Sequence, residues 1–299
     1  KAGITSLEKG KTKYTSNSGL LELRQEISNY INRKCNIEYN PTNEIILSVG
    51  GSEAIDATLR AIITPGDEVI IPQPSYVCYE PITEFLGCVP VIIETRAEDD
   101  FKVTPEQLKK AISPKTKALV LPYPCNPTGA IMERDDLEAL AQILRDTNIL
   151  VISDEIYSEL TFSGKPHVSI ASIDGMRERT VIVNGFSKTF SMTGWRLGFA
   201  CGPHEIIAQM TKIHQFAIMC APTVSQYAAI EALRNCDDAV ADMKAEYNQR
   251  RRLMVNGFNK AGLVCREPKG AFYAFPCIKS TGLTSDEFCE KLLESKHVA

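Results

Sequence analysis

The sequence predicts an α/β protein: a three-layer α/β/α sandwich with a mostly parallel central sheet, followed by a smaller α+β C-terminal domain. Three observations support this prediction. Short β-branched runs alternate along the chain with segments of helical periodicity. The runs are apolar throughout instead of alternating with polar residues, which is typical of parallel strands covered by helices on both faces. A chain of 299 residues is also long enough for a large domain with a second one attached.

The expected elements follow one another in a βαβ rhythm. Strands are expected, in chain order, at 44–51, 67–72, 89–94, in the apolar part of 117–129, and at 149–155, 180–187 and 195–202. Helices are expected at 52–63, 76–87, 104–112, 134–146, 222–233 and 239–261, and the segment EPKGAFYAFP at 267–276 predicts a new strand pair. We place the boundary between a large domain (1–249) and a small one (250–299) near residue 250.

Charge and cysteine content argue against several classes of function. Lys and Arg total 33 against 37 Asp and Glu, and the longest basic run, Arg250 to Arg252, lies in an expected helix, where a solvated face explains it. We therefore expect no nucleic-acid partner. Ten cysteines are scattered without a C-x-x-C pair, and we expect them to be reduced in a cytoplasmic protein. No apolar run approaches the roughly 18 residues that span a bilayer, so we expect no membrane partner.

Residues that directly follow the strands are candidates for a site, because ligands bind at the carboxyl ends of the strands in such a sheet. The first strand is followed by Gly50, Gly51, Ser52 and Glu53. A glycine pair before a helix lets the backbone approach an anion, and the helix N-terminus favours phosphate. The plain alternative is that Ser52 caps the helix. The G-x-G-x-x-G and G-x-x-x-x-G-K-[ST] patterns are absent, which argues against a nicotinamide dehydrogenase and a P-loop NTPase.

Polar residues also follow the fourth and fifth strands. Asn126 begins the string NPTG, which is an ordinary turn when taken by itself. Asp154, Glu155 and Tyr157 follow the next strand. Two adjacent carboxylates at the end of an apolar strand are costly to bury without a partner, so we expect one of them to meet a cationic ligand atom.

The stretch GFSKTFSMTGWRLG at 185–198 places Lys188 directly after the sixth strand. Partial burial at that point lowers the pKa of a lysine and makes its amine a nucleophile toward carbonyl groups. The alternative is a surface lysine whose aliphatic stem lies along apolar residues.

The residues around Lys188 carry a resemblance to a known family. This stretch resembles the lysine signature of the class I/II aminotransferases, a family that binds pyridoxal 5'-phosphate (PLP). The matching residues are Gly185, Phe186, Ser187, Lys188, Ser191, Met192, Gly194, Arg196, Leu197 and Gly198. The strings GGSEA, PSYVCYEP, NPTG, DEIY and GAFY occur in the order and rough spacing of the aspartate, aromatic and alanine branch of that family. The resemblance covers nearly all of the 299 residues and implies the fold of PLP-dependent transferases.

This resemblance implies PLP as the cofactor, no metal, and a role for each residue near the reacting atoms. Lys188 is expected to form a Schiff base with PLP and, once substrate displaces it, to carry a proton between the substrate Cα and the cofactor. Asp154 is expected opposite the pyridine nitrogen, where it keeps that nitrogen protonated and the ring an electron sink. Asn126 and Tyr157 are expected to hydrogen-bond the phenolic oxygen of the ring.

The phosphate group of PLP is expected to meet hydroxyls, a guanidinium and the amides of a helix N-terminus. A planar, always charged arginine suits a phosphate dianion. The residues to which the resemblance assigns this task are Ser187, Arg196, Ser52, Gly51 and Glu53.

Two aromatic residues complete the expected site. Tyr76 matches an aromatic residue that stacks on the cofactor ring, with ordinary core packing as the alternative. Tyr14, in GKTKYTSNSG, matches a tyrosine that reaches the phosphate of the neighbouring subunit. The resemblance therefore implies a homodimer with residues 1–20 at its interface.

The chain departs from the family at both ends. An N-terminal segment with a glycine near the substrate, and a C-terminal segment with the arginine that grips the substrate carboxylate, have no counterpart in the sequence. We therefore expect the gene product to be longer, and the small domain to be incomplete as it stands.

We expect an aminotransferase that moves an amino group between an L-amino acid and a 2-oxo acid by a ping-pong route. A carbon–sulfur lyase or a cyclopropane-forming synthase on the same scaffold is one alternative, and the NPTG string favours the aminotransferase over the lyase. A non-catalytic PLP-binding sensor domain of a transcription regulator is another. The identity of the amino acid and oxo acid does not follow from the fold.

Overall fold

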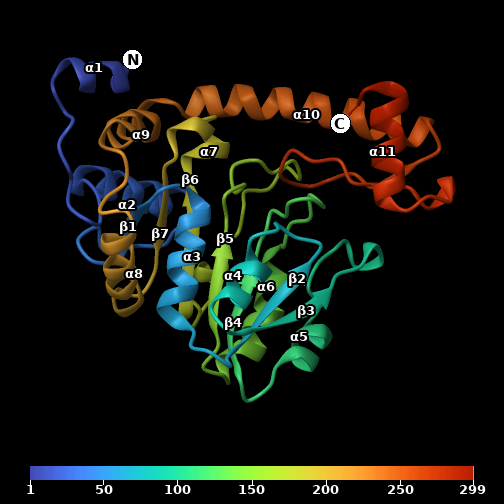
Figure 1. Cartoon of the computed structure of the whole chain (residues 1–299), viewed down its shortest axis with the longest axis horizontal. Helices are drawn as coiled ribbons and strands as arrows, with labels where there is room; N and C mark the ends of the chain where they lie inside the picture. Colours follow the sequence, from blue (N-terminus) through green and yellow to red (C-terminus); the bar gives the residue numbers. More distant parts are fainter. Residues whose placement is uncertain (299) are drawn as a thin grey trace.

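The computed structural model of this protein describes residues 1–298, and within them seven strands form one central sheet (Figure 1). The strands are β1 (Ile45–Ser48), β2 (Glu68–Gln73), β3 (Val89–Glu94), β4 (Thr116–Leu121), β5 (Leu150–Asp154), β6 (Thr180–Gly185) and β7 (Gly198–Cys201). Their order across the sheet is β1-β7-β6-β5-β4-β2-β3. Neighbouring strands are parallel except around β7, which runs antiparallel to β1 and β6. The predicted α/β architecture with a mostly parallel sheet is confirmed.

Helices cover both faces of this sheet: α3, α4 and α8 lie on one face, and α2, α5, α6 and α9 lie on the other. The α-helices of residues 1–298 are, in chain order, α1 (Ala2–Glu8), α2 (Leu21–Cys35), α3 (Gly51–Ile62), α4 (Tyr79–Phe85), α5 (Pro105–Ala111), α6 (Arg134–Arg145), α7 (Phe186–Thr189), α8 (His204–Ala217), α9 (Thr223–Asn235), α10 (Asp237–Lys260) and α11 (Ser285–Lys296). None of the helices in residues 1–298 is both long and apolar enough to cross a membrane.

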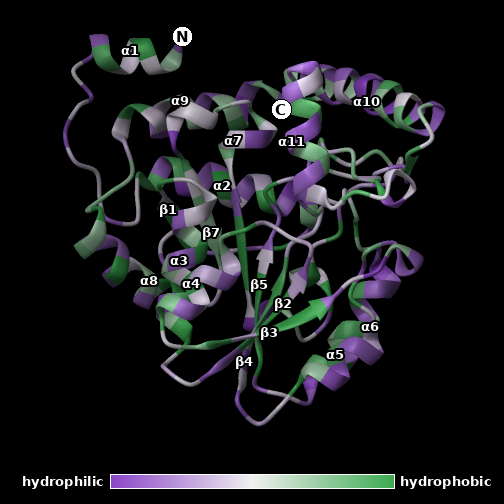
Figure 2. Ribbon diagram, turned by 45° about the vertical axis from the view of Figure 1, so that its right-hand side comes forward, coloured by the Kyte–Doolittle hydropathy of each residue, from purple (hydrophilic) through white to green (hydrophobic). Residues whose placement is uncertain are grey.

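The core consists of two apolar layers, one on each side of the sheet. Ile152 of β5 packs in a buried cluster with residues of α3, α4 and α8. Its neighbour Val151 points to the opposite face and packs in the cluster that contains α5 and α6. A third cluster, of α2 and α9, covers the β1, β6 and β7 part of that second face. Figure 2 shows hydrophobic and hydrophilic residues mixed around α5 and α6, as expected of helices that cover a sheet.

The C-terminal part begins with α10, which runs across the end of the sheet at which β5 and β6 finish (Figure 1). The domain boundary that the sequence predicts at residue 250 falls inside this continuous helix and stays a prediction. After α10 come β8 (Val264–Cys265), β9 (Pro276–Cys277) and α11.

Several local predictions from the sequence were wrong in position. Phe186 and Ser187, expected at the end of a strand, begin α7, and the helix expected at 76–87 begins only at Tyr79. The strand expected at 195–202 begins only at Gly198, because Thr193–Trp195 form a turn of 3-10 helix and Arg196 is left-handed, with φ 49°. The strand pair expected at 267–276 is made by β8, which precedes that segment, and β9, which begins at its last residue, Pro276. Residues between them form a connection in which Ala271 has φ 56°, a left-handed conformation that breaks a strand.

Candidate active site

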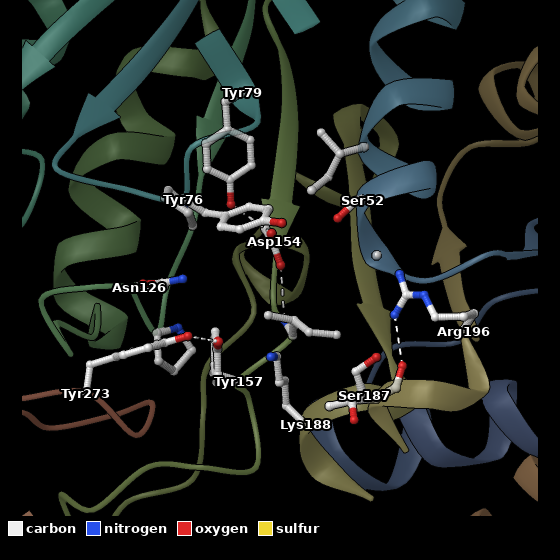
Figure 3. A pocket seen from close by; sticks show the side chains of 16 residues that line it. Ser52, Tyr76, Tyr79, Asn126, Asp154, Tyr157, Ser187, Lys188, Arg196 and Tyr273 are labelled. Atoms are coloured by element: carbon white, nitrogen blue, oxygen red, sulfur yellow. Dashed lines mark hydrogen bonds between the residues drawn. The ribbon is translucent and has the colours of Figure 1, made fainter. Parts of the chain in front are cut away.

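The residues predicted for the site come from separate parts of the chain, and most of them meet at one cavity. The cavity lies at the carboxyl ends of β5 and β6 (Figure 3). Of the eleven residues that the sequence predicts, nine line it: Gly51, Ser52, Tyr76, Asn126, Asp154, Tyr157, Ser187, Lys188 and Arg196. Glu53 and Tyr14 are not among the lining residues.

One end of the cavity is built as a cradle for an anion, which we call the anion cradle and define as Gly51, Ser52, Ser187 and Arg196. Gly51 and Ser52 are the first two residues of α3, where backbone N–H groups lack intrahelical partners and the helix dipole is positive. Ser187 lies in α7 directly before Lys188. Gly50, not Ser52, is the N-cap of α3, and no side-chain capping bond forms there. The alternative that Ser52 serves as the cap is therefore wrong.

The guanidinium of Arg196 is held over the start of α3 by a tight backbone arrangement. Its Nη1 donates a hydrogen bond to the carbonyl of Thr193 at 3.0 Å. A Cβ at Gly50 would lie 2.6 Å from Arg196 Nη2, and Gly50 has φ 82°, so a side chain at position 50 is excluded twice over. The combination of a fixed guanidinium, two hydroxyls and free helix amides fits a phosphate dianion.

Asp154 ends β5 at the floor of the cavity with both carboxylate oxygens occupied. Oδ2 accepts a hydrogen bond from the Tyr79 hydroxyl at 2.8 Å, and Oδ1 accepts one from the Ile156 amide at 3.2 Å. Burial raises the pKa of Asp154, which the bonds from Tyr79 and Ile156 only partly oppose. The neighbouring charge of Glu155 raises the pKa of Asp154 further. A buried carboxylate with room for a cation beside it fits the protonated pyridine nitrogen of PLP.

The adjacent carboxylate, Glu155, belongs to a different environment. It accepts hydrogen bonds from Ser153 Oγ at 2.8 Å and Ser169 Oγ at 2.6 Å, and its Oε2 lies 3.0 Å from His167 Nε2. Successive residues at a strand end point to opposite sides, so Asp154 and not Glu155 reaches the cavity. The sequence predicted that either Asp154 or Glu155 meets a ligand atom, and the structure places only Asp154 at the cavity.

Lys188 brings an amine into the cavity from α7 (Figure 3). Burial lowers its pKa, and the positive charge of Arg196 lowers it further. The amine nitrogen lies 5.8 Å from the centre of the Tyr157 ring and 5.3 Å from that of Phe272. An amine among rings beside a second cation is easier to deprotonate than a surface lysine, which is the condition for attack on a carbonyl.

Hydroxyl and amide groups face the amine from the other side of the cavity. Figure 3 shows Asn126, Tyr157 and Tyr273 together on that side. The hydroxyls of Tyr157 and Tyr273 are 2.7 Å apart. Burial raises the pKa of Tyr157 well above its usual value, so this hydroxyl stays protonated at neutral pH.

Tyr76 lies at the mouth of the cavity. Its side chain is 38% exposed, so ordinary core packing does not describe it. Its ring meets Tyr79 edge to face, with centroids 6.1 Å apart. This leaves a partly open aromatic face for a flat ligand.

The two predicted residues outside the cavity differ in what they do. Glu53 turns its carboxylate away from the site: Oε2 accepts from the Val49 amide at 3.0 Å, and Oε1 lies 3.0 Å from Nδ1 of His214. Its side chain therefore supports the start of α3 from behind. Tyr14 is 82% exposed on the N-terminal segment.

Three polar residues that were not predicted from the sequence also line the cavity. Tyr79 donates a hydrogen bond to Asp154 and lies three residues after Tyr76 in PSYVCYEP, at the start of α4. Tyr273 is the tyrosine of GAFY, and Thr193 precedes Arg196. The strings that contain Tyr79 and Tyr273 can be found in the sequence. Their hydrogen bonds to Asp154 and Tyr157 join segments far apart in the chain, and the spacing of residues does not predict such contacts.

A largely parallel sheet with an amine, a buried carboxylate and an anion cradle around one cavity is the arrangement expected of a PLP-dependent enzyme. The comparisons agree. The chain matches the family described as "Aminotransferase class I and II" over residues 1–299. It therefore belongs to the class I and II aminotransferases, which are PLP-dependent transaminases.

Individual relatives support the same conclusion. The chain is 45% identical over 296 residues to an aspartate aminotransferase of Pyrococcus abyssi, covering 98% of this chain and 76% of that protein. Its structure resembles the crystal structure of an aromatic aminotransferase from Pyrococcus horikoshii OT3, with TM-score 0.97, 44% identity, and coverage of 100% of this chain and 80% of that one. It also resembles an N-succinyldiaminopimelate aminotransferase from Mycobacterium tuberculosis, with TM-score 0.95, 32% identity, and coverage of 98% and 77%.

Proposed function

We propose that Lys188 is the covalent anchor of PLP and the proton carrier of transamination between an L-amino acid and a 2-oxo acid. The observation that carries this proposal is the position of its amine. It lies in the cavity between the anion cradle and the hydroxyls of Tyr157 and Tyr273 (Figure 3), and its pKa is lowered by burial and by Arg196. A lysine in that environment can bond a carbonyl carbon and later exchange a proton.

The other residues hold the reacting groups in place. When bound, PLP supplies an aldehyde for the substrate amine and a ring that accepts the electron pair left at the substrate Cα. Asp154 would hold a positive charge at the ring nitrogen, since its buried carboxylate is stabilised by a cation. Tyr157 and Asn126 would donate hydrogen bonds to the phenolic oxygen, and the Lys188 amine would take the proton from the substrate Cα and deliver it to the cofactor.

The anion cradle orients the phosphate and so fixes the ring relative to Lys188. The Arg196 guanidinium, the hydroxyls of Ser52 and Ser187, and the first amides of α3 supply donors from three separate segments. Tyr76 covers one face of the ring. Proper alignment of the reacting atoms is worth several orders of magnitude in rate, so anchoring at a distance from the chemistry matters.

We also propose that the protein acts as a homodimer, in which Tyr14 reaches the phosphate of the neighbouring subunit. The exposed N-terminal segment supports this idea. The backbone carbonyl of Lys13 accepts a hydrogen bond from the hydroxyl of Thr223 at 2.8 Å, so the segment lies along the start of α9. Exposed apolar side chains continue nearby, with Phe216 86% exposed and Met219 47% exposed. Such a surface suits a second copy of the chain. A location in the cytoplasm stays a prediction from the cysteine pattern.

The test is to load the purified protein with PLP, add single amino acids, follow the absorbance of the cofactor and identify the keto product. Conversion of an amino acid to its 2-oxo acid, with the amino group retained by the cofactor, is expected. Lys188→Ala should abolish both turnover and the covalent absorption band. Lys244→Ala is the matched control, because Lys244 is also half-buried with a lowered pKa but lies outside the cavity. Turnover retained by Lys188→Ala would show that a different lysine acts.

Two other outcomes would replace the proposal. Pyruvate and ammonia from cysteine conjugates would identify a carbon–sulfur lyase. A stable spectral change on substrate binding, with no product, would identify a sensor.

A further inference from the structure

The hydroxyl of Tyr157 already has a partner within the chain. Tyr157 is 4% exposed, and its oxygen lies 2.7 Å from the Tyr273 oxygen. Their rings meet edge to face at 5.8 Å, and Phe272 packs edge-on against Tyr157 at 5.2 Å. The two tyrosines are 116 residues apart in the sequence, so tertiary structure alone brings them together.

The backbone of the segment before Tyr273 is fixed against the turn that carries Asn126. The amides of Lys269 and Gly270 both donate to the carbonyl of Gly129 at 2.9 Å. A Cβ at Gly270 would lie 2.6 Å from the Pro124 side chain, and one at Gly129 would lie 2.2 Å from that of Pro268. The two segments thus touch at backbone distance, which only glycine permits.

The same segment is also fixed to the residues that follow Tyr157. The Ala271 amide donates to the Leu160 carbonyl at 2.9 Å, and the Phe162 amide donates to the Lys269 carbonyl at 2.7 Å. Tyr273 therefore stands at the end of a backbone held on two sides, by the Asn126 turn and by the chain after Tyr157. Its hydroxyl is placed by the fold and does not depend on a mobile loop.

The direction of the bond between the two hydroxyls decides what Tyr157 can do. A phenol has one proton to donate and lone pairs to accept. If Tyr157 donates to Tyr273, its proton is used within the chain. If Tyr273 donates to Tyr157, the Tyr157 proton is available to a ligand oxygen, and the accepted bond makes Tyr157 a better donor.

We propose that Tyr273 is a positioning residue that donates its hydrogen bond to Tyr157 and thereby directs the Tyr157 proton at the phenolic oxygen of the cofactor. The inference rests on the proposed role of Tyr157. Tyr273 acts through Tyr157, so its contribution should exist only when the Tyr157 hydroxyl is present.

The test is a double-mutant cycle read by absorbance. The titration midpoint of the bound cofactor is measured in the wild type, Tyr273→Phe, Tyr157→Phe and the double variant. A donor to the phenolic oxygen stabilises its anion and lowers this midpoint. Tyr273→Phe should therefore raise the midpoint, in the same direction as Tyr157→Phe but by less. On the Tyr157→Phe background, Tyr273→Phe should change nothing.

A control variant and three other outcomes distinguish this proposal from alternative explanations. Tyr247→Phe removes a hydroxyl from the same aromatic cluster, in which Tyr247 stacks on Phe272 at 5.3 Å, and should leave the midpoint unchanged. An unshifted midpoint in Tyr273→Phe, or equal shifts on both backgrounds, would overturn the inference. A rise in substrate KM without a midpoint shift would make Tyr273 a substrate contact instead. If the wild type shows no covalent cofactor band at any pH, the proposed function itself fails.

Discussion

Replacing Arg196 by Gln removes the charge and the two-pronged guanidinium of the anion cradle and leaves a shorter polar side chain. The structure makes this a local change. The guanidinium bonds Thr193 at 3.0 Å and reaches across to the start of α3, where Gly50 leaves space for it. The serines and helix amides of the cradle are not altered by the replacement.

The expected loss follows from the number of bonds. An arginine that grips a phosphate with two N–H groups makes two charge-assisted hydrogen bonds, each worth about 1.5 kcal/mol at the lower end of the usual range. Their loss amounts to about 3 kcal/mol, and since 1.4 kcal/mol is a factor of ten, PLP affinity should fall about 100-fold. Arg196→Lys keeps a positive charge but loses the two-pronged guanidinium, so PLP affinity should fall about tenfold in this variant.

The assay is an absorbance titration of the apoprotein with PLP and, in parallel, with pyridoxal, which lacks the phosphate. Arg196→Gln should strongly reduce the affinity for PLP and leave the affinity for pyridoxal almost unchanged. Arg60→Gln is the matched control, because Arg60 lies in the last turn of the same helix and pairs with Asp56 at 2.8 Å. Equal losses for PLP and pyridoxal would show that Arg196 does not hold the phosphate.

Three further predictions concern pH and stability. Burial and Arg196 lower the pKa of Lys188, so the rate of PLP uptake by the apoprotein should rise with pH and reach half its maximum below pH 10.5, the ordinary pKa of lysine. A rate measured by stopped flow that does not change up to that pH would contradict this prediction. Burial raises the pKa of Asp154, so its contribution to apoprotein stability is complete below the ordinary value of 3.8 and is lost as pH rises through the higher folded-state value. Asp154→Asn should therefore make urea unfolding of the apoprotein less dependent on pH above the ordinary aspartate pKa while weakening PLP binding, and an unchanged pH dependence would refute the burial argument. Glu53→Ala should lower the free energy of unfolding by about 1.5–3 kcal/mol, since it leaves the buried His214 ring without its carboxylate, whereas a loss below about 0.5 kcal/mol would mean that this contact is incidental.

The sequence predicted the architecture and most of the cavity because both depend on local pattern. Apolar runs with β-branched residues identified the strands, and the residues directly after them had to meet at one edge of the sheet. Lys188, Asp154 and Asn126 follow their strands in this way and line the cavity.

What the sequence did not predict depends on direction and on distant contacts. Glu53 sits beside Ser52 in the chain, but neighbouring residues of a helix point about 100° apart, so one faces the cavity and the other faces His214. Tyr273 reaches Tyr157 because a connection, and not the expected strand pair, crosses the Asn126 turn. No spacing rule within one sequence reports such a crossing.

The most direct test of the central claim is to load the protein with PLP, fix the covalent link by borohydride reduction, and map the modified peptide by mass spectrometry. The reduced cofactor is predicted on Lys188, with Asp154 in the cavity beside it. Lys244 is the sharpest rival, because burial lowers its pKa as well. Modification of Lys244 or of any other lysine, with Lys188 untouched, would contradict the assignment of this site.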